Sequence, residues 1–141
     1  MARPGEAFTI VLGFDGSDAA RRGVAHVGRL ATSPKTVVVV AVEPEVRSSS
    51  VTDEPLVGGD FDAERLLDDA TELLSGMEGT AIERRSATGD PAAVIVEVAR
   101  EVDADLLIVG RRGTDFVSRA LLGSVAERVV QQTRCDVLVI A

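Results

Sequence analysis

Five short strand-like runs, separated by stretches with helical periodicity, constrain the fold of this chain most strongly. The runs are rich in β-branched residues, and most are apolar at consecutive positions, which is typical of strands buried on both faces. Alternating strands and helices of this kind predict an α/β domain, with a five-stranded parallel sheet covered by helices on both faces. The predicted strands are Phe8 to Phe14, Thr36 to Val42, Thr80 to Ser86, Asp105 to Val109 and Asp136 to Ile140.

The first two helical stretches are predicted from their apolar spacing and their start signals. Ser17 or Asp18 caps the first, and the second runs from Asp60 to Met77 with apolar residues at i, i+3 and i+4. Glu43 to Gly59 has prolines, glycines and serines without periodicity, which predicts a long mobile loop.

The last two helices have start signals of their own. Asp90 is the expected cap of the third helix, with Pro91 at its first helical position. Ser124 is the expected cap of the fourth, and Glu127 completes a capping box. Charges in the third strand place that strand near an edge of the sheet.

The order of elements predicts where a ligand binds. Five strands in this order usually wind outward from strand one and then return, which gives the doubly wound, Rossmann-like order 3-2-1-4-5. This arrangement is also that of adenine-nucleotide alpha hydrolase-like folds. A crevice then opens at the carboxyl ends of strands one and four, lined by Gly13 to Ser17 and by Gly110 to Gly113.

A spaced set of glycines follows the fourth strand. Gly110 ends the apolar run, Gly113 lies three residues on, and Gly123 and Ser124 directly precede the last helix. Glycine lets the backbone approach a ligand closely, and the N–H groups at a helix start attract anions. The pattern favours phosphate, and therefore a nucleotide.

Composition excludes several classes of function. The chain of 141 residues predicts one domain, residues 1–141, and its net charge of −8 disfavours nucleic acids and anionic membranes. Its longest apolar run falls far short of the ~20 residues that span a bilayer, and no signal peptide is expected. A single cysteine, Cys135, fits a reducing, cytoplasmic setting.

These residues together resemble the universal stress protein family, in its nucleotide-binding form. The family hallmark Gly-x2-Gly-x9-Gly-(Ser/Thr) is matched without a change of spacing by Gly110, Gly113, Gly123 and Ser124. The turn after the first strand, Asp15-Gly-Ser, and the closing strand are also similar, so that the resemblance covers the whole chain.

The resemblance implies ATP as the ligand, with or without Mg²⁺. The glycine loop would bind the phosphates and ribose, Asp15 would lie on the ribose side, and the backbone around Val42 would meet adenine. Gly13 departs from the family, where proline or alanine is common, as does the Arg111-Arg112 pair. The nucleotide-binding residues expected are Gly13, Phe14, Asp15, Val42, Val109, Gly110, Arg111, Arg112, Gly113, Gly123, Ser124 and Val125.

Several of these residues have a structural alternative. Asp15 can orient a ribose or a hydrated Mg²⁺, or can simply form an Asx turn. Arg111, Arg112 and Arg119 either touch phosphate or remain solvated loop charges. His26 and Cys135 are expected to pack, and the pairs Asp68-Asp69 and Asp103/Asp105 are expected to be solvated. No catalytic or metal-binding residue is predicted.

Three classes of function remain open on the sequence. The first is a regulatory ATP-binding protein in the stress response, with an unknown protein partner and little or no catalysis. The second is an adenylating or ATP-hydrolysing enzyme of the same architecture, although its paired glycines after strand one are missing. The third is an interaction module that binds no nucleotide. A phosphoacceptor receiver domain is disfavoured, because the only lysine is Lys35.

The closing strand also predicts self-association. Val137 to Ile140 is apolar on both faces, carries neither proline nor lysine, and is the outermost strand on its side. Pairing with the same strand of a second copy would close a two-fold homodimer, as the family resemblance also implies.

Overall fold

The protein, seen here in a computed structural model that describes residues 8–30, 35–44, 62–111 and 122–141, forms one parallel sheet. The strand order is β3-β2-β1-β4-β5, so the predicted order 3-2-1-4-5 is confirmed. The elements are β1 (Phe8–Gly13), α1 (Asp18–Arg29), β2 (Lys35–Pro44), α2 (Ala63–Leu74), β3 (Thr80–Gly89), α3 (Pro91–Glu101), β4 (Leu106–Gly110), α4 (Ser124–Gln132) and β5 (Asp136–Ile140).

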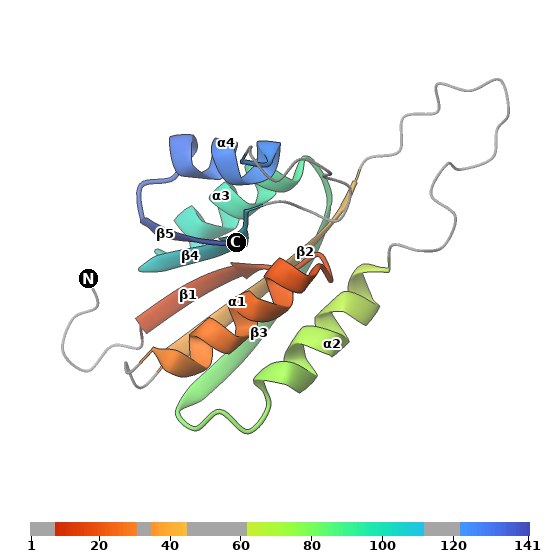
Figure 1. Ribbon diagram of the computed structural model, residues 1–141, viewed down its shortest axis with the longest axis vertical. Coiled ribbons are helices and arrows are strands. Elements are labelled where there is room, and N and C mark those ends of the chain that lie inside the picture. Colours follow the sequence, from red (N-terminus) through yellow and green to blue (C-terminus); the bar gives the residue numbers. More distant parts are fainter. Residues whose placement is uncertain (1–7, 31–34, 45–61, 112–121) are drawn as a thin grey trace, which may run out of the picture.

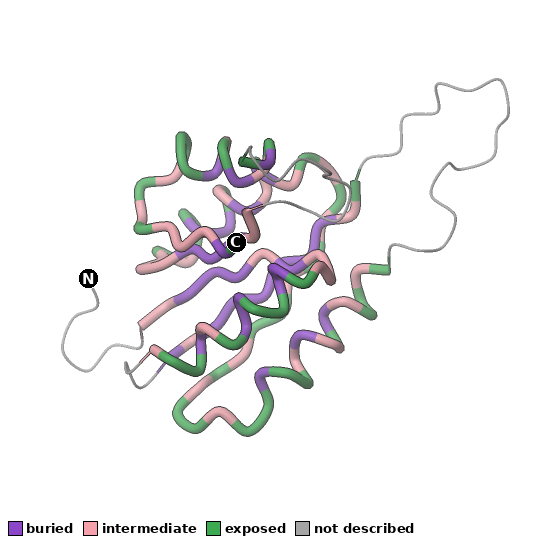
Figure 2. Tube along the Cα trace, in the orientation of Figure 1, coloured by how far each residue is buried: buried purple, intermediate pink, exposed green. Residues whose placement is uncertain are grey.

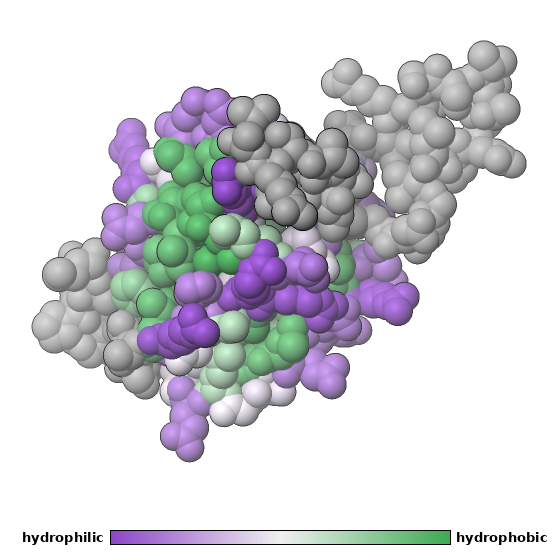
Figure 3. Space-filling view, in the orientation of Figure 1, coloured by the Kyte–Doolittle hydropathy of each residue, from purple (hydrophilic) through white to green (hydrophobic). Residues whose placement is uncertain are grey.

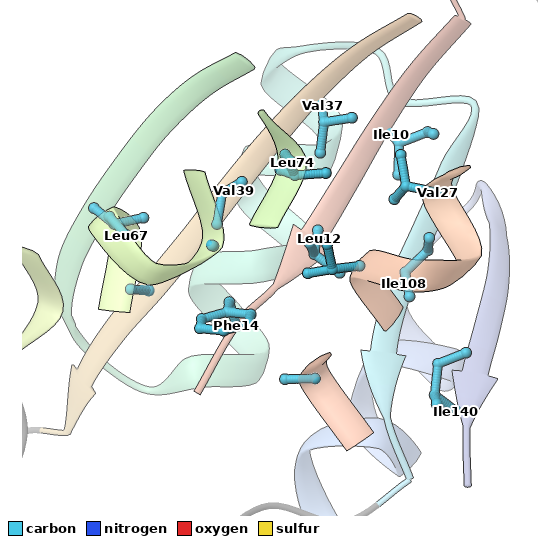
Figure 4. Close-up of a cluster of buried hydrophobic side chains, with 14 of the residues drawn as sticks. Ile10, Leu12, Phe14, Val27, Val37, Val39, Leu67, Leu74, Ile108 and Ile140 are labelled. Carbon is cyan, nitrogen blue, oxygen red and sulfur yellow. The ribbon is translucent and has the colours of Figure 1, made fainter. Parts of the chain in front are cut away.

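The helices cover the sheet in two layers (Figure 1). One core cluster joins α1 and α2 to residues such as Ile10 and Leu12 of β1 (Figure 4). The other joins α3 and α4 to residues that point the opposite way, such as Val11. The middle of β1, Ile10 to Leu12, is consequently buried (Figure 2). The consecutive apolar residues of the central strands thus fill two cores, as expected for a sheet covered on both sides.

The helix starts agree with the sequence in part. Ser17 caps α1, with its Oγ accepting from the N–H of Ala20, as predicted. Asp62 caps α2, two residues after the predicted start. Asp90 is the cap residue of α3 and Pro91 opens the helix, both as predicted, although the Asp90 side chain forms no capping hydrogen bond. The capping box predicted for α4 is wrong, because Gly123 is the cap and Ser124 is the first helical residue.

The edge strand β3 is longer than predicted, since it ends at Gly89 and not at Ser86. Its two arginines, Arg84 and Arg85, both pair with carboxylates of the same chain. β2 extends through Pro44, so the loop predicted from Glu43 begins later, and its residues 45–59 lie outside the described residues.

Two charged residues, Lys35 and Asp105, connect neighbouring elements through hydrogen bonds that the sequence did not predict. Lys35, 7% exposed, donates through Nζ to the carbonyl oxygens of Val27 (3.1 Å) and Leu30 (2.7 Å), at the end of α1. Asp105 was expected to be solvated, but it is half-buried and its Oδ2 accepts from the N–H of Thr9 at 2.9 Å. The carboxylate holds the start of β1 beside β4.

Candidate functional site

The site predicted from the topology lies where β1 and β4 are neighbours. Leu12 of β1 pairs with Ile108 of β4, so Gly13 and Val109 come next to each other at the carboxyl edge. After β1 the chain adds β2 and then β3 on one side of β1, and it returns to add β4 and β5 on the other side. This reversal of direction is the point at which doubly wound sheets open a crevice.

The turn after β1 is built by its own polar groups. Asp15 is half-buried, and its Oδ1 accepts from the N–H of Ser17 at 2.9 Å. Gly16 has a φ of +80°, a conformation that glycine adopts without strain, and Leu66 of α2 packs against it. The Asx turn considered for Asp15 is therefore present. It uses one carboxylate oxygen, and the other can accept from a ligand hydroxyl.

The two ends of the glycine loop meet at the end of β4. The N–H of Gly123 donates to the carbonyl oxygen of Arg111 at 2.7 Å, and the N–H of Arg111 donates to that of Ile140 at 2.6 Å. Gly110 and Gly123 are thus brought together beside the last residue of β5. The predicted site residues Arg112 and Gly113, and Arg119, lie outside the described residues.

The four helix N-termini at this edge differ in how their first N–H groups are satisfied. The side chains of Ser17 and Asp62 accept from N–H groups of α1 and α2. The cap of α4 is Gly123, which has no side chain, and Ser124 beside it is exposed. The first N–H groups of α4 lack an acceptor within the helix, and the positive end of the helix dipole favours an anion there.

An apolar wall lies beside this helix start. Val42 and Val109 are 8% and 3% exposed, and they belong to one packed cluster with Ala92 of α3. Val125 of α4 packs against the same cluster and is only partly buried. Three of the predicted binding residues, from β2, β4 and α4, therefore belong to one packed cluster.

Gly13 faces the same layer. A Cβ at this position would lie 3.0 Å from Cδ1 of Ile95 and 3.5 Å from Cγ1 of Val109. The first distance is tighter than ordinary packing, so the absence of a side chain at Gly13 lets α3 approach β1 closely. This packing explains why Gly13 has no side chain, where proline or alanine is common in the family.

Phe14 is placed differently from the other predicted residues. Its side chain is 2% exposed and packs in the α1–α2 core, on the far side of the sheet from Val42 (Figure 4). Its N–H donates to the carbonyl oxygen of Val40 at 2.9 Å. Only the carbonyl group of this residue is left for the crevice.

One ion pair at this edge was missed by sequence reasoning. Arg128 of α4 contacts Asp90, which precedes α3, through two oxygens: Nη1 lies 2.8 Å from Oδ1 and Nη2 lies 2.5 Å from Oδ2. The hydrogen bond from Arg128 holds the pKa of Asp90 below its ordinary 3.8. Asp90 is also the cap residue of α3, as predicted, and no local pattern in the sequence indicates its distant partner.

A pocket in the described part of the chain lies elsewhere. Its volume is about 510 Å³, and it runs between α3 and β3, lined by residues that include Arg85, Val94 and Glu101. Arg85 is already paired with Glu83 and Glu101 on its rim. The charges in this groove are satisfied within the chain.

The remaining candidate residues carry no evident chemistry. His26 and Cys135 are half-buried, and the Cys135 sulfur lies 3.3 Å from the hydroxyl of Thr133. Asp68 pairs with Arg84 at 2.8 Å. Among the described residues no three His, Cys, Asp or Glu side chains are grouped so that they could hold a metal. The helices described are also too short or too polar to cross a membrane.

Comparison with known proteins identifies the family. Residues 7–141 match the universal stress protein family. The chain belongs to this family. A universal stress protein of Mycobacterium tuberculosis is 31% identical over 138 residues, which cover 94% of each chain. One of Methanocaldococcus jannaschii is 33% identical over 141 residues, covering 93% of this chain and 80% of that one.

A solved structure of the family supports the fold. The crystal structure of a universal stress protein in complex with cAMP matches with a TM-score of 0.71 and 31% identity. The match covers 94% of this chain and 96% of that one. The doubly wound universal stress protein fold is therefore shared along almost the whole chain.

Proposed function

We propose that this universal stress protein binds ATP at the carboxyl edge of its sheet and acts as a regulatory protein in the stress response. The observation that carries the proposal is the junction of Gly110, Arg111 and Gly123. There, the hydrogen bond from the N–H of Gly123 to the carbonyl oxygen of Arg111 holds the start of α4 at the end of β4. No side chain caps this helix start, because its cap residue is Gly123. Support also comes from the relative of 31% identity whose structure contains cAMP, a ligand with an adenine base, a ribose and a phosphate.

Each part of the nucleotide has a counterpart in the site. The N–H groups of the first turn of α4 would receive the phosphates, with Ser124 offering an exposed hydroxyl. The free oxygen of Asp15 would accept from a ribose hydroxyl or bind hydrated Mg²⁺. The wall of Val42, Val109 and Val125 would pack against adenine.

The arrangement favours binding over turnover. Asp15 accepts from Ser17 through one oxygen, and the proposal assigns its other oxygen to ribose or Mg²⁺, whereas both oxygens of Asp90 are held by Arg128. With these assignments neither of the two carboxylates would activate water, and activation of the nucleophile is what a dedicated hydrolase requires. Incubation with ATP should show turnover well below about 1 per second, the low end for enzymes. A faster rate that Asp15→Asn abolishes would favour the enzyme class.

We further propose that two copies pair through β5. Val137, Leu138 and Val139 are only partly buried, although they are apolar. Hydrophobic residues gather on the visible surface where β4 and β5 lie (Figure 3). An apolar edge strand of this kind is rarely left open, and antiparallel pairing with a second β5 would close a two-fold dimer.

Binding can be tested with ATP, AMP and cAMP by isothermal titration calorimetry. Gly123→Ala places a methyl group in a buried cap beside the α4 N–H groups, and should weaken ATP binding about tenfold, or 1.4 kcal/mol. The φ of Gly123 is −64°, which alanine adopts without strain, so the fold should persist. Gly28→Ala on the exposed side of α1 is the matched control and should bind normally.

The same titration distinguishes the classes of function. Unchanged ATP affinity in Gly123→Ala would contradict the placement of phosphate at α4. If the unaltered protein binds none of the three nucleotides at millimolar concentration, the interaction-module alternative is favoured instead.

A further inference from the structure

The ion pair between Asp90 and Arg128 joins the two helices of the α3–α4 layer at the edge that carries the candidate site. It is bidentate, with contacts of 2.8 and 2.5 Å, and both side chains are about two-fifths exposed (43% and 42%). A bidentate guanidinium–carboxylate pair fixes relative orientation as well as distance. Asp90 is also the cap residue of α3, so the pair is anchored at the start of that helix.

The two partners stand on opposite halves of the site. Arg128 lies four residues after Ser124, so the two share one side of α4, a single turn apart. Asp90 follows Gly89, which pairs with Pro44 just beyond Val42. The pair therefore links the helix whose start would hold phosphate to the strand end that would hold adenine.

Small side chains lie close in sequence to both partners of the pair. Ala92, two residues after Asp90, and Ala126, two residues before Arg128, are both buried in the cluster that contains Val42, which also includes larger side chains such as Ile95 and Val129. The alanines allow close approach of α3 and α4. The ion pair adds a directional contact to this packing, which restrains how α4 lies along α3.

We propose that Asp90 and Arg128 are positioning residues that set the start of α4 against the adenine wall, and so determine nucleotide affinity. The inference rests on the proposed function. Neither residue needs to touch the ligand. The pair acts through the placement of Ser124 and the α4 N–H groups relative to Val42.

The other ion pairs lack this geometry. Arg84 joins β3 to Glu64 and Asp68 of α2, and Arg85 joins β3 to Glu101 at the far end of α3. In the part of the chain that the structure describes, only the Asp90–Arg128 pair connects α4 to another element through charged side chains. Glu101→Gln therefore provides a matched control: the same acid-to-amide change beside the same helix, at its opposite end.

The experiment is a double-mutant cycle in ATP affinity. Asp90→Asn and Arg128→Gln should each lower the affinity about fivefold, and the double variant should lose no more than either one, because both break the same contact. The charge swap Asp90→Arg with Arg128→Asp restores an ion pair and should recover affinity to within about twofold. Glu101→Gln should bind as the unaltered protein does, and thermal midpoints report folding of each variant.

The outcomes separate the possible roles. Affinities within twofold of the unaltered protein in both single variants would overturn the proposal, and so would a charge swap that does not recover binding. Loss in Arg128→Gln alone would make Arg128 a direct ligand contact, which also overturns it. Arg128→Lys, which keeps the charge but not the bidentate contact, serves if Arg128→Gln does not fold, and should likewise bind more weakly. Failure of the unaltered protein to bind ATP would overturn the proposed function itself.

Discussion

Lys35 is the only lysine of the chain, and it is one of the few buried ionisable groups of the described residues. Its Nζ donates to the carbonyl oxygens of Val27 and Leu30, two of the last carbonyl groups of α1. A cation at this end of a helix also meets the negative end of the dipole. We expect Lys35→Met to keep the packing of the aliphatic stem and remove the hydrogen bonds.

The magnitude follows from what the substitution leaves behind. A hydrogen bond inside a protein contributes about 0.5–1.5 kcal/mol net, and its loss costs more only where a buried group is left without any partner. The carbonyl oxygen of Val27 keeps the N–H of Leu30 as a donor at 3.2 Å, and water can reach the partly buried contact at Leu30. Loss of the dipole interaction is offset because an ammonium group no longer has to be buried. We expect a net loss of about 1 kcal/mol in the free energy of unfolding.

Thermal and urea denaturation provide the assay. For a domain of this size, about 1 kcal/mol corresponds to a fall of about 4 °C in Tm. Arg29→Met, in the last turn of the same helix but exposed, is the control and should change stability by less than about 0.5 kcal/mol. Stability of Lys35→Met within that same margin would refute the reasoning, since it would mean that the capped carbonyl groups contribute no net free energy.

Two further predictions concern assembly and pH. Val139→Lys should convert the proposed dimer to monomers in analytical ultracentrifugation, because it places like charges together across a two-fold seam; an unaltered protein that is monomeric at micromolar concentration would contradict the β5 pairing. Arg128 lowers the pKa of Asp90 in the folded state below 3.8, so the unfolded state binds the proton more tightly. The stabilisation by this pair is therefore present above about pH 4 and is lost as the pH falls through the folded-state pKa. Acid unfolding followed by circular dichroism should therefore show a shallower pH dependence in Asp90→Asn than in Glu101→Gln.

The strand order could be predicted because each strand segment is short and lies between two helices. β1 and β2 are apolar at consecutive positions and have no solvated face, which forces them to the centre of the sheet, while the charges of β3 exclude it from there. The position of the site follows from that order alone. Ser17 was identifiable as a cap because a cap bonds to residues two or three positions away, within reach of a local pattern.

The contacts that the sequence did not reveal join residues far apart in the chain or invert a local rule. Asp90 is the predicted cap residue of α3, and its side chain also pairs with Arg128, 38 residues on. Ser124 matched a capping box, but Gly123 takes the cap position and leaves the serine exposed inside the helix. A capping serine would occupy the N–H groups that an anion needs, so the departure from the local rule agrees with a site in which a ligand completes the helix start.

The two edge strands of the sheet, β3 and β5, differ in how readily they could pair with another chain. Along β3, Arg84 and Arg85 are engaged by carboxylates of α2 and α3, and a charged edge resists pairing with another chain. Along β5, Val137, Leu138 and Val139 offer no such charge. The carbonyl oxygen of Ile140, at the end of that strand, accepts from the N–H of Arg111, whose own carbonyl accepts from Gly123. The edge through which we propose that two copies pair is therefore connected by two hydrogen bonds to the start of α4, where we propose that phosphate binds.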